Sequence, residues 1–408
     1  MSRSRRVAAL DLGTTKVCCI VADVDGTDVD VIGMGEVPSR GVRKGAVIDI
    51  DRAAEVVADA VDAAEQMAGV PVNSAVVGLA GSHISSQNST GVVAVTGHRE
   101  VRAFDVSRAL EAARAVAIPS DRAIVHVLPR QYTIDGQDGV REALGMSGNR
   151  LEVETHIITG AHTAIQNVVK VMHEAGVDVD EVVLQVLASA EAVLDEEERE
   201  RGVVLVDVGG GTTDVAVFVD GAVVHTGVLP VGGYHVTSDL AVGLRSDLET
   251  AERLKRSHGH CLQLTVPADS SVPLMPLGYE QEVAIPQRYL AEVIAPRARE
   301  MARLMHMEIE KSGPSQRYPG GIVLTGGGAL LAGFLDVIQQ ETDLPARVAA
   351  PTGLHGMDRE VSGPQYATAV GLLRWGARVQ AGKGGLSHRA RRSSGMGSRV
   401  GGWLRGLA

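Results

Sequence analysis

Apolar positions follow two different periods along this chain. Short apolar runs bounded by glycine or polar turns predict β-strands, and longer stretches with apolar residues three and four positions apart predict helices. The expected strands form a tight hairpin at 6–23 and lie at 30–38, 75–80, 155–159, 181–185, 202–207, 215–219, 222–229 and 321–325. The expected helices lie at 51–67, 106–117, 164–175, 188–198 and 287–310, and a closing segment lies at 368–375. This alternation is typical of an α/β protein.

Two polar stretches interrupt the alternation. From residue 82 to about 156, serines and short strands surround a single expected helix, with Pro119 and Pro129 as breakers. This stretch predicts an inserted subdomain. A second polar stretch, with prolines, covers 258–286. Because 408 residues exceed one ordinary hydrophobic core, we expect two lobes.

Composition narrows the class of protein. The chain is 45% apolar, 22% charged and only 3% aromatic, with 48 glycines, which is typical of a soluble protein rich in glycine loops. Its formal charge of −11 argues against a nucleic-acid partner, because phosphate binding needs a basic surface. The last 28 residues differ, since they hold six Lys and Arg and no Asp or Glu. The charge therefore divides into +6 after residue 380 and −17 before it.

The cysteines and the apolar runs bear on the compartment. Cys18, Cys19 and Cys261 are spaced neither as a disulfide framework nor as zinc ligands, which is typical of a reducing cytoplasm. The first residues show no signal-peptide pattern, and no run of about 18 apolar residues occurs. We therefore expect a chain that neither leaves the cell nor spans a membrane.

One short motif occurs twice. The segment 11–17, Asp-Leu-Gly-Thr-Thr-Lys-Val, recurs at 207–215 as Asp-Val-Gly-Gly-Gly-Thr-Thr-Asp-Val, an alignment that inserts two glycines in the second copy. A glycine turn after a strand presents backbone N–H groups that can hold phosphate oxygens. The repeat predicts two similar lobes, each with one acidic, glycine-rich turn facing a shared cleft. The expected phosphate-binding residues are Gly13, Thr14, Thr15, Lys16, Gly209, Gly210, Gly211, Thr212 and Thr213.

An aspartate precedes each turn and would repel phosphate unless a cation lies between them. We therefore expect Asp11 and Asp207 to bind Mg²⁺ through water, because magnesium keeps most of its hydration shell. Two further glycine motifs, Gly232–Gly233 before a helix and the triplet Gly326, Gly327 and Gly328 after a strand, would complete the site. A single such turn is more often a plain hairpin. The four glycine motifs in this order are not explained as plain hairpins. The sequence contains neither a P-loop nor a dinucleotide-binding fingerprint.

This order of motifs resembles that of the actin-like ATPases. The segments 38–41, 79–88, 207–214, 321–328 and 366–373 further resemble the FtsA family of bacterial cell-division proteins over essentially the whole chain. The resemblance implies an actin-like two-lobed α/β fold with an inserted subdomain called IC and a C-terminal amphipathic membrane helix. Its implied parts are lobe I at 1–83 and 157–200, IC at 84–156, lobe II at 201–257 and 316–380, subdomain IIB at 258–315, a linker at 381–396 and the membrane helix at 397–408.

The same resemblance implies ATP between the lobes. Glu252 and Lys255 fall in the helix that contacts adenosine in relatives, although a Glu/Lys pair at this spacing is equally well a solvated helix face. The heat-shock chaperones of the superfamily carry an acid at a position that aligns near Val186, and the polar neighbour here is Gln185. We expect weak or no ATPase activity, with Gln185 as a weak candidate for orienting water.

The C-terminal residues carry an amphipathic pattern. Val400, Trp403, Leu404 and Leu407 share one helical face, and Arg399 and Arg405 lie off it, as in a helix that lies on anionic lipid. Four glycines disfavour this helix in water. A tail that docks on its own protein, or a cloning remnant, would show the same pattern.

The resemblance also implies partners. The family binds the C-terminal tail of the tubulin-like division protein FtsZ along the long helix of IIB, where Arg288, Arg297 and Arg299 could pair with an acidic peptide. A solvated charged face would read the same. The implied protein polymerises on the cytoplasmic face of the inner membrane at the septum, tethers FtsZ filaments and recruits later division proteins. Its rivals are another actin-like adaptor such as PilM, or a sugar or acetate kinase of the same superfamily.

Overall fold

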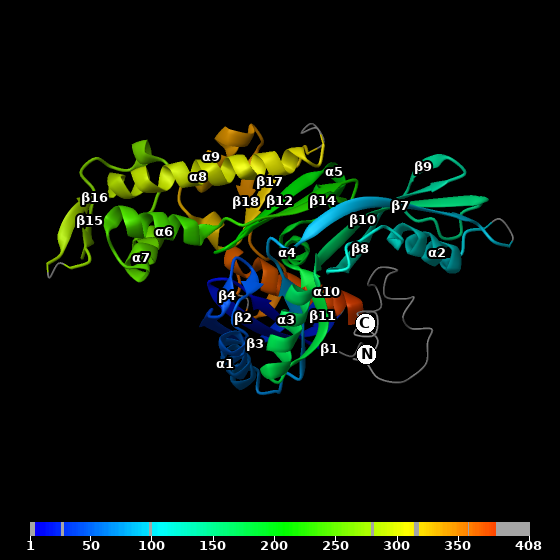
Figure 1. The fold of residues 1–408 in the computed structure, drawn as a ribbon, viewed down its shortest axis with the longest axis horizontal. Helices are drawn as coiled ribbons and strands as arrows, with labels where there is room; N and C mark the ends of the chain where they lie inside the picture. Colours follow the sequence, from blue (N-terminus) through cyan, green and yellow to red (C-terminus); the bar gives the residue numbers. More distant parts are fainter. Residues whose placement is uncertain are drawn as a thin grey trace.

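The computed structural model describes residues 5–25, 28–97, 100–278, 281–313, 318–357 and 359–380. Figure 1 shows an elongated upper layer and one lobe beneath it. The lower part is lobe I, the middle of the upper layer is lobe II, and smaller units extend from both ends of that layer. The predicted linker at 381–396 and the predicted membrane helix at 397–408 lie outside the described residues.

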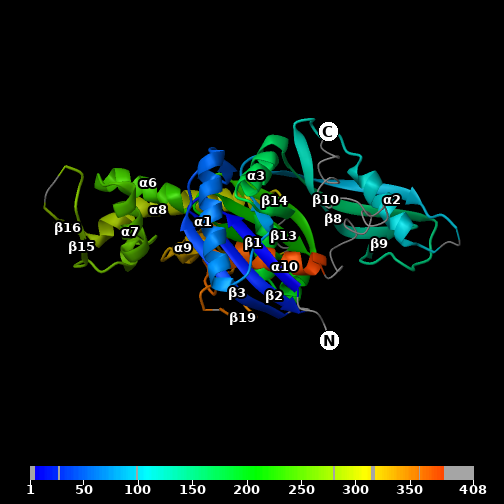
Figure 2. The ribbon, with the colours of Figure 1, turned by 90° about the horizontal axis from the view of Figure 1, so that it is seen from below.

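Lobe I is built on a six-stranded sheet with the strand order β11-β6-β1-β2-β3-β19. The strands are β1 (Arg5–Leu12), β2 (Lys16–Asp25), β3 (Asp28–Pro38), β6 (Ser74–Leu79), β11 (Asp178–Leu184) and β19 (Leu354–Gly356). Helices α1 (Ile50–Ala68) and α3 (His162–Glu174) cover one face, as Figure 2 shows for α1. Helices α4 (Gln185–Val193) and α10 (Ala367–Gln380) cover the other. Because both faces are covered, the strands are apolar at nearly every position.

Lobe II has a five-stranded sheet with the order β14-β13-β12-β17-β18. The strands are β12 (Val203–Val208), β13 (Thr213–Val219), β14 (Ala222–Leu229), β17 (Ile322–Thr325) and β18 (Ala346–Val348). Alternate β12 residues point to different cores: Leu205 packs with α4 and α10, and Val204 packs with α8. The layer of α4 and α10 therefore belongs to both lobes and joins them.

The left end of the upper layer in Figure 1 is helical. It contains α6 (Gly233–Leu244), α7 (Leu248–His258), the strands β15 (Ser271–Leu274) and β16 (Val283–Pro286), and the long helix α8 (Gln287–Glu310). Helix α9 (Phe334–Thr342) packs against α8. The expected helix at 287–310 is confirmed at both ends.

The right end is a separate unit made from residues of the polar stretch. Its sheet has the order β7-β10-β8-β9, with α2 (Ala103–Arg114) packed against it. The strands are β7 (Ser85–Ala94), β8 (Arg122–Ile134), β9 (Gln137–Val140) and β10 (Arg150–Ala161). Strand β10 runs through residue 156 without a break, so the strand expected at 155–159 is its C-terminal half. The inserted subdomain boundary at 156 stays a prediction.

One expected helix divides in two. The pattern at 188–198 predicts one helix, but the chain forms α4 and then α5 (Glu196–Arg201). Leu194, in an extended conformation, ends the first helix, and Asp195 caps the second. The Asp195 carboxylate accepts a hydrogen bond from the Glu198 backbone, and the Glu198 carboxylate accepts one from the Asp195 backbone.

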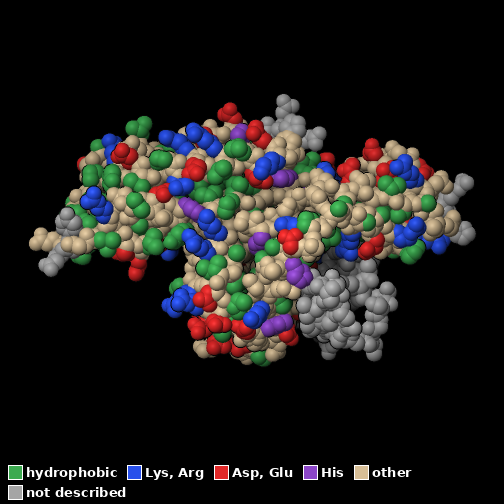
Figure 3. Space-filling model, viewed as in Figure 1, with side chains coloured by type: hydrophobic (Ala, Val, Ile, Leu, Met, Phe, Trp, Pro, Cys, Tyr) green, Lys and Arg blue, Asp and Glu red, His purple; other side chains and the backbone are tan. Residues whose placement is uncertain are grey.

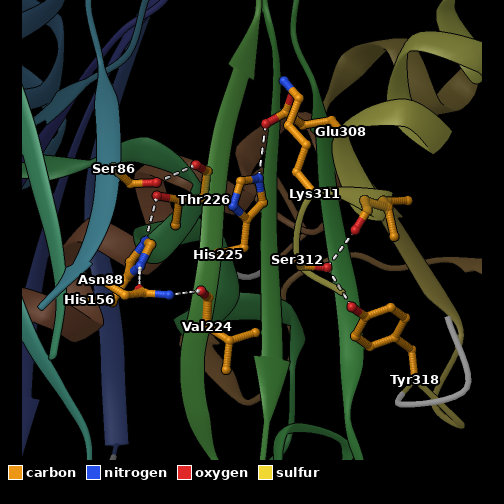
Figure 4. Close-up of polar contacts among 11 residues, drawn as sticks. Ser86, Asn88, His156, Val224, His225, Thr226, Glu308, Lys311, Ser312 and Tyr318 are labelled. Atoms are coloured by element: carbon orange, nitrogen blue, oxygen red, sulfur yellow. Dashed lines mark hydrogen bonds and ion pairs between the residues drawn. The ribbon is translucent and has the colours of Figure 1, made fainter. Parts of the chain in front are cut away.

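Lobe II and the inserted unit meet along β14, an edge strand of its sheet. Ser86 Oγ donates to the Thr226 carbonyl over 2.8 Å, and the Asn88 amide donates to the Val224 carbonyl over 3.5 Å. The buried His156 ring lies between Asn88 Oδ1 at 2.7 Å and Thr226 Oγ1 at 3.0 Å. Figure 4 shows these contacts beside the pair formed by His225 and Glu308. Polar side chains thus fix the insert to lobe II.

Two searches of the described ranges bear on membranes and metals. None of the helices there has the length and apolar character needed to cross a bilayer. No group of three His, Cys, Asp or Glu side chains there is placed to hold a metal ion directly. All three cysteines are free and buried.

Candidate functional site

The two copies of the repeated motif form equivalent hairpins. Asp11 pairs with Cys18 across β1 and β2, and Asp207 pairs with Asp214 across β12 and β13. Each turn between these strands contains four residues, 13–16 in lobe I and 209–212 in lobe II. The alignment with two inserted glycines is therefore wrong in space, because the turns are equal in length.

The two turns lie against each other at the junction of the lobes. A Cβ on Gly210 would lie 2.4 Å from the Thr15 methyl group, and one on Gly211 would lie 2.5 Å from Thr14 Oγ1. Thr14 Oγ1 also accepts a hydrogen bond from the Gly45 backbone. Glycine at 210 and 211 is thus what lets the two turns approach each other, and the expected approach of phosphate oxygens to these glycines stays a prediction.

The aspartate before each turn is buried and held by hydrogen bonds. Asp11 Oδ1 accepts from the Gln185 amide at 2.9 Å. Asp207 Oδ2 accepts from Ser189 Oγ at 2.5 Å and from Thr368 Oγ1 at 3.0 Å. Burial raises the pKa of both carboxyls, that of Asp11 to about 7. Two buried carboxylates with only neutral hydrogen-bond donors form a site that a cation would stabilise.

A third carboxylate in this site was missed by the sequence reasoning. Asp214, at 3% exposure, accepts a hydrogen bond from Thr212 Oγ1, and its Oδ1 is buried without a hydrogen-bond partner in the described residues. Burial, with the nearby Asp207, raises its pKa to about 8. The signal was its place at the end of the second motif copy, where the first copy has no acid.

These observations test whether Mg²⁺ fits. An unpartnered buried oxygen on Asp214 and three carboxyls whose pKa values are all raised by burial fit a cation. Because magnesium keeps most of its water shell, these carboxylates would hold it through water. Asp11 and Asp207 would be the residues that hold it.

Lys16 is the last residue of the first turn and the first residue of β2. Its ammonium pairs with Glu36 at 2.8 Å and lies 3.6 Å above the ring centre of Tyr366. The lysine thus has two partners on β3 and near α10.

The remaining glycine motifs pack against the second turn. The Gly233 N–H donates to the Gly209 carbonyl at 3.0 Å, and a Cβ on Gly232 would lie 2.6 Å from the same oxygen. A Cβ on Gly326 would lie 2.3 Å from Asp207 Oδ1, and one on Gly328 would lie 2.4 Å from the Val208 side chain. Gly327 has room, with Gln365 at 3.6 Å.

Glu252 and Lys255 lie beside the Gly232–Gly233 motif, with the lysine side chain 13% exposed and the glutamate side chain 41% exposed. Lys255 Nζ donates to the Gly233 carbonyl at 3.1 Å, to Thr237 Oγ1 at 2.9 Å and to Glu252 at 2.6 Å. Burial lowers the pKa of Lys255. The structure therefore brings together the predicted residues of the turns, the two glycine motifs and α7.

The chain is similar to known proteins over most of its length. A family model described as "Cell division protein FtsA" matches residues 204–371, and one described as "SHS2 domain inserted in FTSA" matches 81–159. Cell division protein FtsA of Pseudomonas aeruginosa is 42% identical over 378 residues, which cover 92% of this chain and 90% of that protein. The chain belongs to the FtsA family. It is a cell-division protein with an actin-like fold.

Other relatives agree. The Escherichia coli K12 FtsA is 37% identical over 98% of this chain and 96% of its own, and that of Bacillus subtilis is 36% identical over 93% and 85%. Among solved structures, a PilM–PilN type IV pilus biogenesis complex has a TM-score of 0.63 at 16% identity, covering 91% of this chain and 98% of that one. MreB5 of Spiroplasma citri bound to ADP has a TM-score of 0.56 at 16% identity over 93% and 98%. PilM thus shares the fold, and FtsA is the family.

The two further sets of predicted residues fare differently. Of the arginines on α8, Arg288 donates to the Val266 carbonyl, Arg297 pairs with Asp239 and Glu300, and Arg299 is exposed. The membrane-helix residues Arg399, Val400, Trp403, Leu404, Arg405 and Leu407 lie outside the described residues.

Proposed function

We propose that this FtsA-family chain binds ATP with Mg²⁺ between its lobes and uses the bound nucleotide to fix the arrangement of the lobes. The observation that supports this most is the meeting of two equal turns from different lobes, each with a buried aspartate behind it. Backbone N–H groups of 13–16 and 210–213 would bind phosphate oxygens, whereas the Gly209 N–H already donates to the Thr212 carbonyl. MreB5 of Spiroplasma citri has been solved bound to ADP and bound to AMPPNP, and this supports a nucleotide at the same place in this chain.

The proposed site assigns a role to each group. Asp11 and Asp207 would hold the hydrated ion, which would neutralise phosphate charge. Lys16 would turn from Glu36 toward the phosphates. Gly232, Gly233, Glu252 and Lys255 would border the adenosine, and residues 326–328 would take the flat face of the nucleoside.

Titration of a fluorescent ATP analogue, with Mg²⁺ or with EDTA, tests this site. We expect Lys16→Met to weaken binding about tenfold or more, the size of a charged hydrogen bond. Lys170→Met, which removes a lysine on the surface of α3, is the matched control. Equal affinities of both variants and the wild type would remove Lys16 from the site.

We further propose that turnover is slow or absent. Val186 is fully buried and apolar, and Gln185 is hydrogen-bonded to Asp11. Position 186 therefore carries no acid in this chain, whereas the heat-shock chaperones of the superfamily carry one there.

The membrane role rests on sequence. Residues 397–408 would form an amphipathic helix on anionic lipid, with 381–396 as the linker, so that one copy binds weakly and a polymer binds firmly. Deleting 397–408 should release the protein from liposomes containing anionic lipid. Neutral liposomes are the control, and unchanged sedimentation of the truncated chain would refute the anchor.

The FtsZ partner rests on the family and on α8. We propose that IIB, at 258–315, binds the acidic C-terminal tail of FtsZ. Self-polymerisation and contacts with later division proteins would use the rest of the body, which is lobe I (1–83 and 157–200), IC (84–156) and lobe II (201–257 and 316–380). These contacts would form at the cytoplasmic face of the inner membrane. Figure 3 shows basic and acidic side chains interspersed over α8 and acidic ones around α1.

Variants at two arginines of α8 distinguish an effect on FtsZ tail binding from an effect on the stability of the fold. Arg299→Glu should weaken FtsZ tail binding with little change in melting temperature, because Arg299 is exposed. Arg297→Glu should lower the melting temperature, because it breaks pairs with Asp239 at 2.7 Å and with Glu300. Tail affinity unchanged in Arg299→Glu would exclude this residue from the surface.

A further inference from the structure

Helix α4 touches the aspartates of both lobes. Gln185, in its first turn, donates to Asp11 of lobe I, and Ser189, four residues later, donates to Asp207 of lobe II. Residues four apart lie on the same helix face. One helix face therefore meets both carboxylates that would hold the ion.

Thr368 adds a second hydroxyl to Asp207. It is the second residue of α10, and its Oγ1 donates to the same Oδ2 at 3.0 Å and lies 3.0 Å from Ser189 Oγ. Ser189, Thr368 and Asp207 are all buried. Both hydroxyls thus donate to one oxygen of one buried carboxylate.

Close packing of the two helices makes this arrangement possible. A Cβ on Gly371 of α10 would lie 1.7 Å from the Ala188 carbonyl of α4. This contact places the first turn of α10 beside the middle of α4, where Ser189 lies. Two donors on Oδ2 fix the rotation of the Asp207 carboxylate and leave Oδ1, which lies on the side of Gly326.

We propose that Ser189 and Thr368 are positioning residues for Mg²⁺: they hold Asp207 so that Oδ1 faces the hydration shell of the ion. Gln185 does the same for Asp11, so α4 sets the distance between the two carboxylates. This inference rests on the proposed nucleotide site. Hydrogen bonds behind a metal-binding side chain commonly change metal affinity 10- to 100-fold.

The test separates the ion from the nucleotide. A fluorescent ATP analogue is titrated with Mg²⁺ against the full chain and against Ser189→Ala, Thr368→Val and Thr368→Ser. The matched control is Thr342→Val, which removes a buried hydroxyl from α9, where its partner is the Ile338 carbonyl. Thermal melting of each variant checks the fold.

We expect Ser189→Ala and Thr368→Val to raise the Mg²⁺ concentration for half-maximal binding about tenfold or more. Binding in EDTA should stay at the wild-type level, and Thr368→Ser should restore the Mg²⁺ dependence. A purely structural role would instead weaken binding equally with and without Mg²⁺, and this result overturns the inference. A wild-type chain that binds nucleotide without any Mg²⁺ dependence would overturn it as well and leave nucleotide binding standing, whereas no nucleotide binding at all would refute the proposed function itself.

Discussion

The ammonium of Lys16 lies 2.8 Å from a carboxylate oxygen of Glu36 on the neighbouring strand. The lysine and the glutamate are both partly exposed, and the Tyr366 ring covers the lysine. A lysine that must bind phosphate therefore begins in an ion pair that competes with the phosphate.

The first prediction follows from this competition. Glu36→Gln should tighten binding of an ATP analogue about threefold, because a partly exposed ion pair is worth less than about 1 kcal/mol. The control is Glu174→Gln, which frees the exposed Lys170 in the same way. Weaker binding in Glu36→Gln would show that Glu36 helps to place the lysine.

The second prediction concerns turnover. Gln185 is occupied by Asp11, so we expect a low steady-state rate of phosphate release and less than about a twofold change in Gln185→Ala. Phosphate release measured at saturating ATP and saturating Mg²⁺ checks this, so that a weaker hold on the ion in Gln185→Ala does not lower the rate. Rapid turnover in the wild type that Gln185→Ala abolishes would make Gln185 the group that orients water.

The third prediction concerns the contact between α4 and α10. Gly371→Ala should destabilise the fold by about 2 kcal/mol or more, since the new methyl group would lie 1.7 Å from a backbone oxygen and force the helices apart. Denaturant unfolding measures the change. Gly243→Ala in α6 is the control, because its methyl group would meet only the Val293 side chain, at 3.1 Å.

The fourth prediction concerns acid. Burial, with His225 and Arg130 nearby, lowers the pKa of His156 to about 3, and an unfolded histidine titrates near 6.5. Between these values the unfolded chain binds a proton that the folded chain excludes, so stability falls as the pH drops below 6.5. His156→Gln should lose part of this pH dependence in urea unfolding from pH 7 to 5.

A surface histidine provides the comparison for that experiment. His173→Gln on α3 changes a side chain that is 41% exposed, and we expect it to keep the wild-type pH dependence. Identical pH profiles for the wild type and His156→Gln would show that His156 is not the group that responds.

Much of the fold could be predicted because its signals are local. The period of apolar residues placed α1 within one residue at each end, and α8 matched at both ends. The error at 188–198 is also local: Asp195 and Glu198 form a capping box inside a run that otherwise suits one helix. Propensity alone does not show which of several acidic residues will cap.

The site was only partly predictable, for a different reason. Glycines and aspartates around strand ends announce a close turn, and the structure brings all of these groups together. Ser189 and Thr368 carry no such signal, because a serine or threonine in an apolar helix is common. Their role depends on packing between segments 161 and 179 residues apart. The equal turn lengths likewise became visible only from the strand pairing.

The joint between the insert and lobe II has a consequence for the solubility of the protein. An edge strand with unpaired backbone groups can recruit a strand from another molecule and begin aggregation. Ser86 and Asn88 occupy the carbonyls of Thr226 and Val224 on β14, so a foreign strand would have to displace them. The inserted unit thus shields this edge from pairing with a strand of another molecule.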